Sequence, residues 1–150
     1  MPDFPPSQAA VDLGAHLETL GRSIGAREAE HAAGFEAARA RIERLHGLVT
    51  GAVERFHAAA WASGAPHLRI EVTEIRVDDK HLRAHEFDLV RGRHKAVVTA
   101  KSRGDVTLVG PFRVGKAEGP CRSFDADAEA ELESALVSFL VSFLEAAAAP

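Results

Sequence analysis

A helical stretch that is too long for the domain it belongs to constrains this chain most. From Ser7 to about Ser63 there is no proline, and apolar residues recur at alternating spacings of four and three. They are Leu13, Leu17, Leu20, Ile24, Phe35, Ala38, Ile42, Leu45, Val49, Ala52, Phe56 and Ala59. One helix of this length would measure about 80 Å, whereas a compact domain of 150 residues has a radius of gyration of about 15 Å. The helix must therefore bend back, or project and meet a partner.

We expect a kink in this helix, because the apolar spacing slips near residues 20–28, where Gly21 and Gly25 also lie. The part from Phe35 to Trp61 has the wider apolar face, joined by Leu48 and Val53, and should lie on a sheet. Residues 7–25 are then expected to project as an oligomerisation helix. Its seam would be formed by Leu13, Leu17, Leu20 and Ile24. The proline-rich residues 1–6 are predicted to be a disordered leader.

Four strands of an antiparallel meander are predicted at residues 68–77, 82–91, 94–101 and 105–110. Apolar matching pairs Val77 with Leu82, Ile75 with Ala84, Val72 with Phe87 and Ile70 with Leu89, with a joint bulge near residues 73–74 and 85–86. A tight turn at Gly92-Arg93 pairs Leu89 with Ala96, and a turn at residues 102–104 pairs Ala100 with Val106. A short edge strand at 112–114 is an option.

A C-terminal amphipathic helix is predicted to begin near Ser123 or Asp125 and to close the fold. The fold class is therefore α+β, a single domain over residues 7–150 built from the long helix, the four-stranded meander and the closing helix.

Composition excludes several classes of protein. A hydrophobic fraction of 46% supports a core, and the net charge of −4 is mild. The single Cys121 excludes an intrachain disulfide. The N-terminus lacks the features of a secretory signal, and no apolar run reaches 18 residues, so we expect a soluble cytoplasmic protein without a membrane partner.

No motif predicts catalysis, a metal site or a cofactor. Residues 110–116 fit the first seven positions of a phosphate-binding loop, but Ala117 replaces the required hydroxyl and Gly119-Pro120 follows where a helix should begin. The eight histidines lack the spacing of metal ligands and are expected to be surface or partly packed. The tripeptide Arg103-Gly104-Asp105 is interpreted as a turn.

Charge is distributed unevenly, because residues 66–122 carry a balance of +4 and residues 123–150 a balance of −6. The meander should gather basic residues at one end of the sheet, and Arg91, Arg93, His94, Arg113 and Lys116 form the candidate anion-binding site. The competing and favoured interpretation is that this end meets the acidic residues 125–133 within the protein or its dimer.

The sequence therefore predicts a non-enzymatic, homo-oligomeric interaction or adaptor protein, with itself as the principal partner. One alternative is a module that binds an anionic ligand, an acidic protein or nucleic acid through the basic end of the sheet. The other is a small enzyme that uses the Gly/Pro-rich loop at residues 110–122 as one wall of a pocket.

Overall fold

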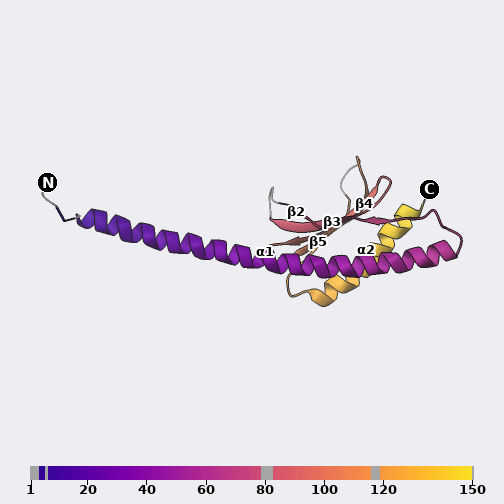
Figure 1. The fold of residues 1–150 in the computed structure, drawn as a ribbon, viewed down its shortest axis with the longest axis horizontal. Helices are drawn as coiled ribbons and strands as arrows, with labels where there is room; N and C mark the ends of the chain where they lie inside the picture. The colour runs from indigo at the N-terminus through magenta and orange to yellow at the C-terminus, as the bar shows by residue number, and fades with distance from the viewer. Residues whose placement is uncertain (1–3, 6, 79–82, 116–118, 150) are drawn as a thin grey trace.

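The computed structural model describes residues 4–5, 7–78, 83–115 and 119–149. It is an α+β fold with a long N-terminal helix, an antiparallel sheet and a C-terminal helix, as the sequence predicted (Figure 1). The helices are α1 (Gln8–Ala62) and α2 (Glu129–Ala148). The strands are β1 (Glu71–Val72), β2 (Arg76–Asp78), β3 (Ala84–Arg91), β4 (His94–Lys101), β5 (Val106–Arg113) and β6 (Cys121–Phe124). The predicted leader lies largely outside the described residues.

The long helix is continuous over 55 residues and curves only gently, so the predicted kink at Gly21 and Gly25 is wrong (Figure 1). The side chain of Ser7 caps its N-terminus by accepting a hydrogen bond from the backbone N–H of Ala10 at 3.2 Å. The slip in apolar spacing has a simpler reason than a kink. In an unsupercoiled helix of 3.6 residues per turn, an extra step of four keeps the apolar stripe on one face.

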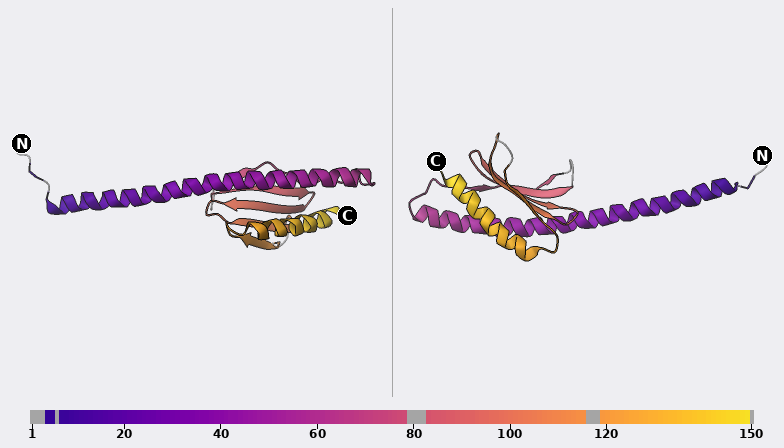
Figure 2. Two further views of the ribbon diagram at one scale, coloured as in Figure 1. Left: turned by 90° about the horizontal axis from the view of Figure 1, so that it is seen from below. Right: turned by 180° about the vertical axis from the view of Figure 1, so that it is seen from behind.

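Both helices cover the same face of the sheet, with α1 over β3 and β4 and α2 over β4, β5 and β6 (Figure 2). The sheet contributes alternate residues of each long strand to the core between them, including Phe87, Leu89, Val98 and Leu108. The core side of α1 consists of Ala38, Ile42, Leu45, Val49 and Val53. The core side of α2 consists of Leu132, Ala135, Leu136, Phe139, Phe143 and Ala147.

Leu48 does not belong to the sheet-facing stripe, contrary to the prediction, because its side chain is 50% exposed. It lies one helical step of about 100° from the buried Val49, which moves it off the face that meets the sheet.

The central hairpins have the predicted register. Leu89 pairs with Ala96 and Ala100 with Val106, and the left-handed φ of 59° at Gly92 suits the tight turn between β3 and β4. The sheet order is β1-β3-β4-β5-β6, with β2 also on the β3 edge.

The predicted first strand is divided into β1 and β2, and its register with β3 is wrong. Val72 pairs with Leu89 rather than Phe87, and Val77 pairs with His85. Residues 73–75 interrupt the edge strand, so a bulge falls where one was expected, although β3 continues through it. The predicted partner of Val77, Leu82, lies outside the described residues.

The C-terminal third departs from the prediction because of a sixth strand. Ser123, taken for the start of a helix, belongs to β6 and pairs with Thr107, and the two hydroxyl oxygens lie 3.1 Å apart. The closing helix therefore begins later, at Glu129. The optional edge strand at residues 112–114 is largely the end of β5, which extends to Arg113.

Two leucines of α1 test this packing with one substitution each. Leu45→Ala should lower the free energy of unfolding by about 2–5 kcal/mol, because the side chain is fully buried. Leu48→Ala, the matched control three residues away, should cost less than about 1 kcal/mol. Urea unfolding followed by circular dichroism measures both. Equal losses for the two variants would contradict the described orientation, because they would mean that α1 is rotated about its axis so that Leu48 also faces the sheet.

Candidate functional site

The first candidate surface is the N-terminal part of α1, which extends well beyond the sheet (Figure 1). Every residue from Gln8 to Glu30 is exposed. The seam residues Leu13, Leu17, Leu20 and Ile24 are 59%, 54%, 47% and 45% exposed. Four large aliphatic side chains aligned along one face without a partner are unusual on a water-facing helix. They form an apolar stripe that the described fold leaves uncovered.

The seam lies on the same face of α1 as the residues that contact the sheet. With 3.6 residues per turn, the four seam positions fall within an arc of about 60°. The five buried positions, Ala38, Ile42, Leu45, Val49 and Val53, fall within an overlapping arc of about 80°. One apolar stripe therefore runs along the helix, covered by the sheet over its second half and open over its first.

Glycines accompany the seam without any role inside the single chain. A Cβ built on Gly14, Gly21 or Gly25 would meet no atom within 4 Å. Each glycine in a helix interior costs about 1 kcal/mol relative to alanine. The packing of one chain therefore gives no reason for these residues.

A groove of about 900 Å³ lies where α1 leaves the sheet. Its lining includes Ile24, Arg27, His31 and Arg83. Among the described residues, the buried Nε2 atom of His31 has no hydrogen-bond partner. The groove ends where Gly34 meets the β4–β5 turn, since a Cβ at Gly34 would lie 2.2 Å from the carbonyl oxygen of Ser102.

The second candidate surface is the basic end of the sheet, where the structure brings four of the five predicted residues together. His94 pairs with both Arg91 and Arg113, so these three form a row across β3, β4 and β5. The carbonyl of Arg93, in the turn, accepts a hydrogen bond from the N–H of Val114 at 2.8 Å. Lys116, the fifth, lies outside the described residues.

Within one chain the acidic start of α2 does not neutralise this row, contrary to the favoured interpretation, whose version between two copies stays a prediction. Glu129 instead accepts a hydrogen bond from Arg41 of α1 at 2.9 Å and forms an ion pair with Arg44, and Glu133 lies 3.8 Å from Arg44. The error has a topological cause, because α2 begins at the opposite end of the sheet from the β3–β4 turn (Figure 1).

The basic row meets the other end of α2. The guanidinium of Arg91 donates a hydrogen bond to the carbonyl oxygen of Ala147 in the last turn. That turn contains no basic residue of its own. Arg91 therefore satisfies a free carbonyl and opposes the negative end of the helix dipole. Among the described residues, no ion pair involves Arg91, Arg93 or Arg113.

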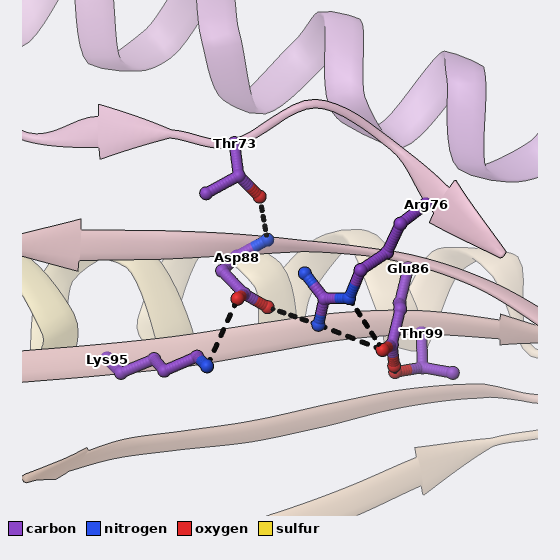
Figure 3. Close-up of polar contacts among 6 residues, drawn as sticks. All are labelled: Thr73, Arg76, Glu86, Asp88, Lys95 and Thr99. Carbon is purple, nitrogen blue, oxygen red and sulfur yellow. Dashed lines mark hydrogen bonds and ion pairs between the residues drawn. The ribbon is translucent and has the colours of Figure 1, made fainter. Parts of the chain in front are cut away.

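A polar network that the sequence did not predict lies on the face of the sheet opposite the two helices (Figure 3). Arg76 bridges Glu86 and Asp88, each at 2.8 Å, and Lys95 lies 3.2 Å from the buried carboxylate of Asp88. The hydrogen bond from Arg76 to Asp88 raises the pKa of Arg76. The network is satisfied internally and holds β2 against β3. The alternation of Glu86 and Asp88 with apolar residues along β3 is the sequence pattern that could have predicted this network.

Histidines join the long helix to the sheet edge. His46 contacts the carbonyl oxygen of Thr73 at 2.9 Å, and the Nε2 atom of His57 accepts a hydrogen bond from the N–H of Ile70 at 2.8 Å. Burial and the nearby Arg69 lower the pKa of His57, which keeps its ring neutral for that contact. These contacts give both rings a structural role.

The described residues contain no cluster of three or more His, Cys, Asp or Glu side chains that could hold a metal ion. The first residues of the phosphate-loop lookalike belong to β5, and the next described residues, 119–124, lead into β6 rather than a helix. The Arg103-Gly104-Asp105 tripeptide closes the β4–β5 turn, with Arg103 bonded to Asp105 at 2.7 Å. Neither α1 nor α2, the helices of the described chain, is long and apolar enough to cross a membrane.

Comparisons with protein-family models, curated proteins and solved structures found no match. Inference about function therefore rests on these two surfaces.

The contact between Arg91 and α2 can be tested by stability. Arg91→Ala should lower the free energy of unfolding by about 1.5–3 kcal/mol, the usual worth of a hydrogen bond to a charged group. Arg93→Ala, its control on the adjacent turn, should change it by less than about 0.5 kcal/mol, since Arg93 is exposed. Urea unfolding of both variants measures the difference, and a neutral Arg91→Ala would show that the contact is incidental.

Proposed function

We propose that this protein is a homo-oligomeric interaction module that assembles through the projecting half of α1. The observation that carries the proposal is the exposed seam of Leu13, Leu17, Leu20 and Ile24. Fully burying an aliphatic side chain of this size contributes roughly 1.5–3 kcal/mol. Two seams packed together would remove eight such side chains from water, a gain that the isolated chain forgoes.

The local sequence supports a helical partner rather than a flat surface. The residues around the seam alternate in steps of four and three, which is the spacing that allows side chains of two helices to interlock. The charged residues of the same segment, such as Glu18 and Arg22, pair with each other on another face at 3.4 Å. The seam is therefore free of charge that would have to be desolvated on association.

A second copy is the partner that always accompanies this chain. Its seam has the same length and the same apolar character, and closed two-fold assembly places such a patch against itself. In this proposal the sheet and α2 form a rigid body that fixes α1, and α1 supplies the contact.

A charged substitution in the seam provides the test. The purified protein should have at least the mass of a dimer at tens of micromolar by light scattering, and Leu17→Glu should raise the dissociation constant by roughly 100-fold or more, because a carboxylate would have to be buried. Thr19→Glu, a control on the exposed side of the same turn, should leave the mass unchanged. A monomeric mass for the unmodified protein would refute the proposal.

Binding of an anionic ligand at the basic end is a second candidate function. The observation in its favour is that Arg93 and Arg113 are exposed and, within the described residues, unpaired. A labelled oligonucleotide should then bind with an affinity that falls steeply between about 50 mM and about 200 mM salt. The double variant Arg93→Ala/Arg113→Ala should abolish binding without unfolding the protein. No binding at low salt would eliminate this function.

A further inference from the structure

We infer that two copies associate through α1 in an antiparallel arrangement. The two-fold axis passes between the two helices, perpendicular to them, at the level of Glu18 and Thr19. The inference rests on the proposed self-association and specifies its orientation and register. It pairs Leu13 with Ile24 of the second copy, and Leu17 with Leu20 of the second copy.

The seam matches itself when it is reversed about its own centre. Its residues are separated by four, three and four positions, a palindromic pattern. Turning one copy end for end therefore superimposes the pattern on itself without a gap. An isologous antiparallel contact in this register therefore gives each residue of the patch an apolar counterpart on the other copy.

A parallel arrangement through the same seam is blocked by the sheet. The seam and the sheet-contacting residues of α1 share one face, so a parallel partner helix would continue into the space that β3 and β4 occupy. Helices in contact lie 8–10 Å apart, and a sheet packs against a helix at about the same separation. The backbone of the β4–β5 turn already reaches Gly34, where it would block the partner. The antiparallel helix runs the other way and ends before it.

The length of the projecting segment fits this register. When Leu17 lies opposite Leu20, Gln8 of the second copy lies opposite Ala29. The partner helix then begins about five residues, or roughly 8 Å along the axis, short of Gly34. Its first turn lies beside the groove lined by Ile24, Arg27 and His31, which one chain leaves open. Nearly the whole exposed part of α1 is used and no part of the sheet is displaced.

Charges at the ends of the seam are complementary in the same register. Asp12 of one copy lies within two positions of the point opposite Arg27 of the other, on the same flank of the helix pair. Within one copy these residues are about 22 Å apart along α1, so they cannot meet. Among the described residues, neither takes part in an ion pair in the single chain. On the other flank, Gly14 lies within two positions of the point opposite Gly21 of the second copy, and small residues there allow close approach.

Charge reversal tests the register. Asp12→Arg and Arg27→Asp should each raise the dissociation constant, by roughly tenfold, because each dimer contains the contact twice. The double variant Asp12→Arg/Arg27→Asp should restore affinity to within about threefold, measured by analytical ultracentrifugation. Additive losses in the double variant would overturn the antiparallel register, because that register places Asp12 of each copy near Arg27 of the other.

A spin-label measurement separates orientation from association. Gln8→Cys in a Cys121→Ser background carries one label per copy. The antiparallel arrangement predicts a separation between the labels of about 30 Å, because the two Gln8 positions lie 21 residues apart along the pair. A parallel pair would give about 10–15 Å. The short distance would overturn the orientation and leave self-association intact, whereas the absence of any distance between copies would refute the proposed function as well.

Discussion

The packing of one stripe of α1 on β3 and β4 governs the rest of the molecule. Ile42, Leu45 and Val49 are fully buried there, and they fix the rotation of the helix about its axis. Polar contacts at the edges of the interface hold the same rotation, through His46 to Thr73 and Arg41 to Glu129. Because an α-helix transmits its rotation along its length, this packing also decides which way the projecting seam faces. The interaction properties of the free half are therefore set by the anchored half.

Sequence patterns predicted those parts of the fold that depend on neighbouring residues, such as short turns. They failed where contacts between residues far apart in the sequence determine the structure. The β3–β4 and β4–β5 registers followed from short turns whose glycines restrict the geometry. The pairing of β1 with β3 depended instead on apolar matching, which placed the interruption near residues 73–75 but not the register on either side of it. Likewise, Ser123 has the residue type of a helix cap, but its pairing with Thr107 of β5 outweighed that local preference.

The candidate surfaces were predictable to different degrees. The seam could be read from spacing alone, and its four side chains are 45–59% exposed in the described part of the chain. The basic end could be predicted because short turns place the ends of neighbouring strands side by side, but the segment that contacts it was misassigned. The opposite net charge suggested the start of α2, whereas in the fold the acidic Glu129 of that segment pairs with Arg41 and Arg44. The carbonyl that Arg91 contacts carries no sequence signal, because every residue has one.

The glycines of the projecting half connect folding with assembly. Gly14, Gly21 and Gly25 together cost the free helix about 3 kcal/mol relative to alanine, and one chain offers no contact that offsets this cost. Because α1 is already nucleated on the sheet, the free half can extend, but each glycine weakens the extension. In the proposed dimer a second helix along the seam would change the balance, since missing side chains permit closer contact. Helix formation and self-association in this segment would then be one equilibrium, anchored at one end by the sheet.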